Sequence, residues 1–156
     1  MRSHRCIVLI IILLSIIFQR CNVDDICLSN QHAVRAYFML MEEKERAMVQ
    51  RATIYGLGMP NDSIYKEENV TNMFLPLSFT KDTTSFLIFI QNESFRDTIH
   101  FVHTKKMNFI SRECGFTFDF LIDTVYFSKM FIDSVAVINP NVRYNENVEN
   151  VEIYIY

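Results

Sequence analysis

The chain has 156 residues, of which half are hydrophobic and 13% are aromatic, and its formal net charge is −3 at pH 7. This length and hydrophobic content suit one folded domain and exclude an intrinsically disordered chain. The acidic balance argues against a nucleic-acid partner, because nucleic-acid-binding proteins carry a clustered basic surface.

The first 20 residues have the pattern of a secretory signal of the lipoprotein type. Arg2 and Arg5 precede an unbroken apolar run over residues 6–18, and Cys21 follows almost at once. A run of about 13 residues is shorter than the roughly 20 that a membrane-spanning helix needs, so it fits the core of a cleaved signal peptide. We therefore predict a signal peptide over residues 1–20.

Cys21 stands where a bacterial lipoprotein signal places its lipidated cysteine, and we predict that it carries acyl chains such as palmitate. Several acyl chains together give stable anchoring to a membrane. Arg20 departs from the small residue that usually precedes such a cysteine, so an ordinary cleaved signal or a short uncleaved anchor remains the alternative. Residues 21–26 form a short tether, in which Asp24 and Asp25 resemble a surface-export signal or make a solvated linker.

The four cysteines of the chain divide between three roles. Cys6 lies within the signal and Cys21 would carry lipid, which leaves Cys27 and Cys114. Two remaining cysteines in an exported chain predict one disulfide, with two buried free thiols as the alternative. The disulfide would close a loop of about 86 residues and, in the chain-entropy model, stabilise the fold by about 4–5 kcal/mol. Two cysteines without a clustered partner do not predict a metal site.

From residue 27 onward, most segments have the hydrophobic pattern of short strands. Residues 116–120 alternate most cleanly between apolar and polar side chains, and residues 86–90 are continuously apolar, as in a central strand covered on both faces. In chain order, we predict strands at 34–40, 50–57, 73–79, 86–90, 98–103, 108–112, 116–120, 134–138 and 151–156.

Turn-forming residues separate these strands at 58–62, 81–82, 92–94, 105–106 and 139–141. Many short strands at this spacing predict an all-β fold: a single antiparallel β-sandwich, immunoglobulin-like or similar, over residues 27–156. Residues 42–49 could form one helix or a charged hairpin tip. The last strand, 151–156, could lie at an exposed sheet edge.

The pair His100 and His103 has the spacing of a helical metal site, but the segment has strand character. Residues three apart on a strand point to opposite faces, so chelation would need a bulge. We predict two partly exposed histidines, no metal and no cofactor.

A second pattern, Asp followed by Ser or Thr and an apolar residue, resembles an O-glycosylation motif of bacterial envelope proteins. Its structural alternative is a turn that an Asp side chain closes before a strand begins. We favour turns at these positions, which are Asp62, Asp97, Asp123, Asp133 and, loosely, Asp82.

Three short motifs occur in order: D-D-I-C-L at 24–28, L-P-L at 75–77 and S-R-E-C-G-F at 111–116. On these motifs the chain resembles an uncharacterised family, a domain of unknown function, of small predicted lipoproteins from Gram-negative gut anaerobes. The resemblance implies an outer-membrane lipoprotein, on the periplasmic or the surface side, and the pairing of Cys27 with Cys114. It implies no activity.

Together these features predict a lipid-anchored cell-envelope protein that acts as a non-enzymatic binding or structural module. Without residues 1–20, which hold three arginines and no acid, the net charge falls from −3 to −6, which disfavours binding to anionic lipid through charge alone. An envelope protein or a glycan is the expected partner. The alternative is a hydrolase of envelope or surface polysaccharide, for which Asp119 and Asp123 could supply two carboxylates about 5–10 Å apart.

Overall fold

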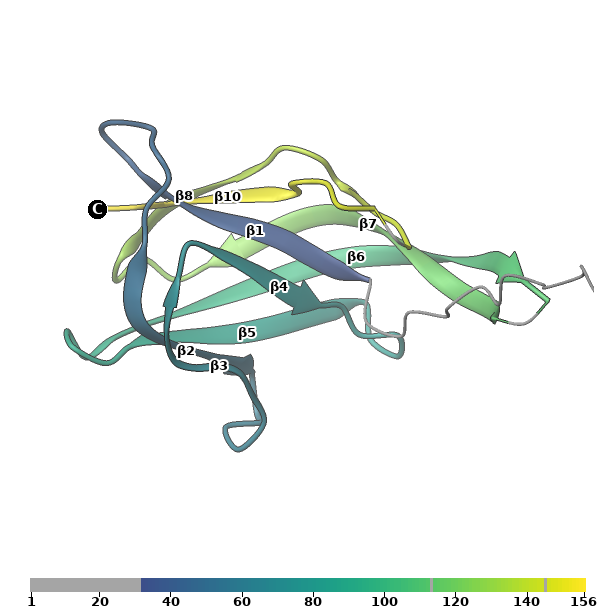
Figure 1. Cartoon of the computed structure of the whole chain (residues 1–156), viewed down its shortest axis with the longest axis horizontal. Coiled ribbons are helices and arrows are strands. Elements are labelled where there is room, and N and C mark those ends of the chain that lie inside the picture. The colour runs from purple at the N-terminus through teal and green to yellow at the C-terminus, as the bar shows by residue number, and fades with distance from the viewer. Residues whose placement is uncertain (1–31, 113, 145) are drawn as a thin grey trace, which may run out of the picture.

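The computed structural model describes residues 32–112, 114–144 and 146–156, so the predicted signal peptide and tether lie outside the described residues. This part of the chain contains ten strands and no helix. The strands form two sheets, which confirms the predicted all-β sandwich (Figure 1). Within the described ranges, no helix could cross a membrane.

The smaller sheet has four strands in the order β4-β1-β10-β8. Its strands are β1 (Ala33–Leu40), β4 (Asn72–Pro76), β8 (Ile132–Val137) and β10 (Val151–Ile155). β10 lies between β1 and β8, pairing in parallel with the first and antiparallel with the second. The expectation of an exposed edge at the last strand is therefore wrong, because Val151 and Ile153 are fully buried between two neighbours. The sheet is also mixed rather than purely antiparallel.

The larger sheet is antiparallel, with the order β3-β2-β5-β6-β7-β9. Its strands are β2 (Val49–Gly56), β3 (Ser63–Val70), β5 (Thr83–Ile90), β6 (Phe95–Ser111), β7 (Gly115–Phe127) and β9 (Asn141–Val142). In β5 the alternate residues Phe86, Ile88 and Ile90 are buried, while Leu87 and Phe89 are half-buried. This strand is central, as predicted, but only one of its faces is fully covered.

The predicted turn at residues 105–106 is wrong, because these residues lie inside β6, which is one continuous strand of 17 residues. Lys105 pairs in register with Phe120, and Lys106 pairs with Asp119. Two lysines are tolerated within the strand because the Lys105 ammonium reaches the Asp82 carboxylate at 3.1 Å and Lys106 is exposed. The two strands predicted at 98–103 and 108–112 are thus one.

Residues 42–49 form the hairpin tip and not the helix. The Lys44 N–H donates to the Leu40 carbonyl oxygen at 3.0 Å, and Met39 bridges Arg46 in antiparallel fashion. β3 was not predicted at all, because its polar residues pair with one neighbour only and most of its side chains are exposed.

The Asp-(Ser/Thr) positions have three different structural settings. Asp62 and Asp82 directly precede β3 and β5, as the turn interpretation predicts, and Asp133 is the second residue of β8. Asp97 and Asp123 instead lie inside β6 and β7, so the turn interpretation is wrong for these two.

Asp97 is buried, with an exposed fraction of 1%, and its carboxylate organises the loop before β8. The backbone N–H groups of Met130, Phe131 and Ile132 donate to it at 2.7–3.0 Å, and the Ser128 hydroxyl donates to Oδ1. Four donors on one carboxylate satisfy the backbone of a loop that joins the two sheets.

Candidate functional site

A groove with a volume of about 490 Å³ opens between the β2–β3 and the β4–β5 connections. We call it the hydroxyl groove, since residues 78–85 give it five hydroxyl side chains. Its polar lining is Asp62, Ser78, Thr80, Lys81, Thr83, Thr84 and Ser85. Its apolar lining is Gly56, Leu57, Met59, Ile64, Pro76, Leu77 and Phe86.

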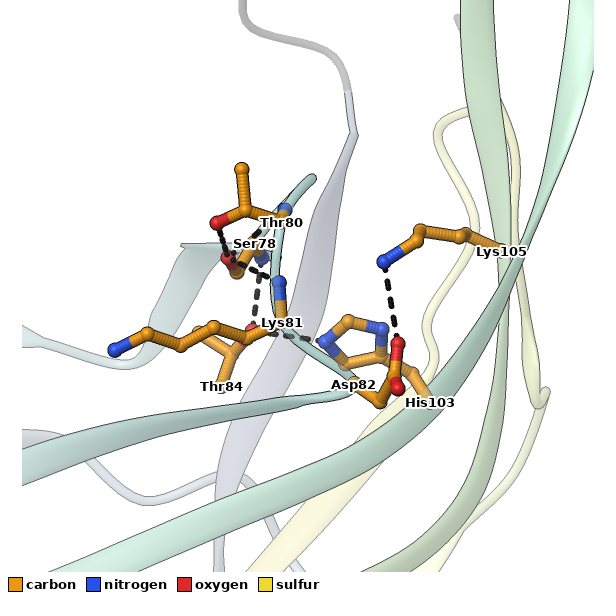
Figure 2. Close-up of polar contacts among 7 residues, drawn as sticks. All are labelled: Ser78, Thr80, Lys81, Asp82, Thr84, His103 and Lys105. Carbon is orange, nitrogen blue, oxygen red and sulfur yellow. Dashed lines mark hydrogen bonds and ion pairs between the residues drawn. The ribbon is translucent and has the colours of Figure 1, made fainter.

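The β4–β5 connection that lines the groove is fixed by its own hydroxyls (Figure 2). The Ser78 hydroxyl oxygen accepts the backbone N–H groups of Thr80 at 3.3 Å and Lys81 at 3.1 Å. The Ser78 N–H in turn donates to Thr84 Oγ1 at 2.8 Å. Such side-chain to backbone bonds hold a turn in one conformation.

β6 clamps the same connection through His103. The His103 Nε2 lies 2.8 Å from Thr84 Oγ1, and the His103 N–H donates to the Asp82 carbonyl oxygen at 2.9 Å. The imidazole also packs edge-to-face on Phe120, with the ring centroids 5.2 Å apart. The Lys81 side chain extends away from this clamp, as Figure 2 shows, and so leaves its ammonium available to a ligand.

The His103 ring has a hydrogen-bond contact through one of its two nitrogens. Burial, and secondly the charge of Lys105, lower the pKa of His103, so the ring is neutral at pH 7. A hydroxyl activated for catalysis needs a base that a third group orients. Within the described part of the chain, His103 Nδ1 is buried and has no hydrogen-bond partner, so no carboxylate orients this ring.

A smaller cavity of about 290 Å³ adjoins the groove, with which it shares Ile64, Pro76 and Leu77. His32 lines it, stacks at 5.3–6.4 Å on the rings of three aromatic residues and lies within hydrogen-bond distance of the Thr117 hydroxyl. The three aromatic residues are Phe79, Phe120 and Tyr144. Burial lowers the pKa of His32 as well. The other residues that line this cavity are apolar: Ala33, Ile64, Phe74, Pro76, Leu77 and Phe79.

The two histidines that the sequence singled out do not form a site together. His103 is buried and faces the core, whereas His100 is half-buried on the other side of β6, with Nδ1 2.7 Å from Ser85 Oγ. The prediction that both are partly exposed is wrong for His103. Among the residues that the structure describes, no group of three or more metal-ligating side chains occurs.

Asp119 and Asp123, the candidate carboxylates, are four residues apart on β7, so strand rise separates their Cα atoms by about 13 Å. Asp119 accepts the Asn108 side-chain amide at 3.1 Å and the Tyr144 backbone N–H at 3.2 Å. Asp123 is exposed at a break in the β6–β7 register.

Of the predicted lipid and disulfide residues, Cys21 and Cys27 lie outside the described residues. Cys114 lies in the turn between β6 and β7, and its N–H donates to Ser111 Oγ at 3.1 Å. Gly115, with φ of +71°, adopts the left-handed conformation that turns the chain into β7.

Sequence reasoning did not predict the hydroxyl groove. The sequence feature that marks the groove is the hydroxyl-rich run over residues 78–85, where we predicted only the end of one strand and a turn. The contribution of β6 could not be foreseen, because His103 reaches the run from 19 residues further along the chain.

The geometry defines a two-sheet all-β domain with an open groove at the β4–β5 end. The chain belongs to DUF6452, a family of unknown function, whose model matches residues 51–155. The L-P-L and C-G-F motifs lie within this match and the D-D-I-C-L motif precedes it. Searches of curated proteins and of solved structures returned no match.

Proposed function

We propose that this protein is a lipid-anchored, non-enzymatic binding module of the cell envelope that holds a glycan in the hydroxyl groove. The observation that carries the proposal is the combination of an apolar floor with a hydroxyl-rich wall that His103 holds in place. Binding sites typically combine a largely apolar lining with a few well-placed polar groups. A sugar matches this lining, because it presents C–H groups on its ring face and hydroxyls at its edge.

The order of the wall favours affinity. Because Ser78, Thr84 and His103 already hold the β4–β5 connection, little conformational entropy is lost when a ligand binds. Lys81 and Thr83 are exposed at the groove, where their polar atoms can reach a ligand.

The anchor is proposed from residues 1–21, whose basic start, short apolar run and Cys21 match a lipoprotein signal. The proposal includes a Cys27–Cys114 disulfide. It is supported by the sequence, in which Cys114 follows residue 27 while the other three cysteines lie at or before that residue. A disulfide fits an exported protein.

Lys81→Ala should weaken glycan binding about tenfold, because hydrogen bonds to a charged group contribute about 1.5 kcal/mol or more. Isothermal titration calorimetry with oligosaccharides released from bacterial envelope polysaccharide measures the affinity. Thr83→Ala should weaken binding about threefold, since its hydroxyl is neutral.

Lys129→Ala is the matched control, because Lys129 is an exposed lysine outside the groove. It should bind like the wild type. If no oligosaccharide binds, or if all three variants bind equally well, the glycan proposal is wrong.

A further inference from the structure

The end of the β6–β7 hairpin extends beyond the strands of the smaller sheet (Figure 1). Phe118 still contacts the body of the domain, with its ring centroid 5.9 Å from that of Phe79. Beyond it, no strand of the smaller sheet pairs with or covers the hairpin in the described residues.

Three large apolar side chains lie on this outer part of the hairpin, and we call them the hairpin strip: Met107, Phe109 and Phe116. Met107 and Phe109 alternate along β6, and their register partners on β7 are Phe118 and Phe116, so all four share one face. The strip residues are 62%, 53% and 68% exposed. The face of the hairpin that packs on the core near Phe118 therefore stays apolar towards the hairpin turn, where it is exposed to solvent.

The face opposite the strip is polar. Lys106 alternates with Met107, so it is exposed on that opposite face, where it pairs in register with Asp119, and Arg112 is exposed next to the hairpin turn. Residues 104–121 carry three cations and two acids, a net charge of +1, whereas residues 21–156 as a whole carry −6. An apolar face opposite a face that carries lysine or arginine is typical of segments that lie in the interface of a bilayer.

We propose that the hairpin strip inserts into the interfacial layer of the membrane to which the protein is anchored. This inference rests on the lipid anchor and the Cys27–Cys114 disulfide proposed above. Cys114 lies at the hairpin turn, and five residues lie between Cys21 and Cys27, so the two cysteines are at most about 20 Å apart. The acyl chains on Cys21 would therefore enter the bilayer close to the strip.

The chain contains no tryptophan, so one introduced tryptophan is a clean fluorescent reporter. Phe116→Trp places it in the strip. Tyr126→Trp is the matched control, because Tyr126 lies on the same strand, is 61% exposed and is far from the hairpin turn. Each full-length variant is purified from membranes and reconstituted into vesicles of phosphatidylethanolamine and phosphatidylglycerol with brominated acyl chains.

Emission of the Phe116→Trp variant should shift to the blue and fall by more than about half, since interfacial side chains lie ~5–10 Å deep, beside the quencher. Emission of the Tyr126→Trp variant should stay unchanged. Matching thermal unfolding of both variants and the wild type shows that the fold is intact.

Flotation of the vesicles reports the anchor separately. If the protein floats with the vesicles and the Phe116→Trp emission is not quenched, the hairpin proposal fails and the anchor stands. A blue shift without quenching would assign the strip to a protein surface instead and would also overturn the proposal. A protein that carries no acyl group and does not float would overturn both.

Discussion

Asp97→Ala should destabilise the domain by about 3–5 kcal/mol, because it removes the acceptor of three buried backbone N–H groups and one hydroxyl. Small domains are typically stable by only about 5–15 kcal/mol, so this loss is a large part of the total. Urea denaturation followed by circular dichroism measures the free energy of unfolding.

Asp123→Ala is the matched control, since Asp123 occurs in the same Asp-Thr-apolar pattern but is exposed on the neighbouring strand. Its effect should stay within about 0.5 kcal/mol. If Asp97→Ala does not fold, the free energy of unfolding is measured on Asp97→Asn instead. The Asn amide oxygen keeps part of the acceptor capacity, so the expected loss of stability is about 2 kcal/mol. A loss below 1 kcal/mol or so in Asp97→Ala would show that the carboxylate does not hold the loop.

Cys114→Ser should cost about 4–5 kcal/mol, because opening the proposed disulfide with Cys27 releases a loop of about 86 residues in the unfolded chain. The measurement is urea denaturation of the oxidised protein. Reductant provides the internal control: it should lower the stability of the wild type to that of Cys114→Ser and leave the variant unchanged.

Two other outcomes of the reductant experiment would contradict the Cys27–Cys114 disulfide. If reductant does not change the stability of the wild type, no disulfide contributes to it. If it destabilises Cys114→Ser as well, the bridge joins other cysteines of the chain.

Local pattern predicted the strands whose side chains alternate regularly. Residues 151–155 and 116–120 are strands as expected, since burial on one face imposes a period of two. The local pattern did not predict β3, which is an edge strand with exposed polar residues. It also predicted a turn at Lys105 and Lys106, because adjacent charged residues are common in turns, although both lie within β6. In both cases, pairing with a neighbouring strand, which local sequence does not encode, determined the structure.

The candidate site depended still more on contacts between distant residues. The hydroxyl run over 78–85 is visible in the sequence, but the floor of the groove comes from β2, β3 and β5, and the clamp comes from β6. Asp97 shows the same limit, because its partners lie more than 30 residues away. Sequence pattern thus predicted the class of fold, while the groove needed the arrangement of strands in space.

We propose that this domain is a lipid-anchored envelope protein with a Cys27–Cys114 disulfide. Mass spectrometry of the protein purified from its native membrane tests this claim most directly, under reducing and non-reducing conditions and with Cys21→Ala as the control. We predict an acylated N-terminus at Cys21 that is absent from Cys21→Ala, together with a disulfide-linked peptide pair containing Cys27 and Cys114. An unacylated soluble protein that begins elsewhere, or free thiols at both cysteines, would contradict it.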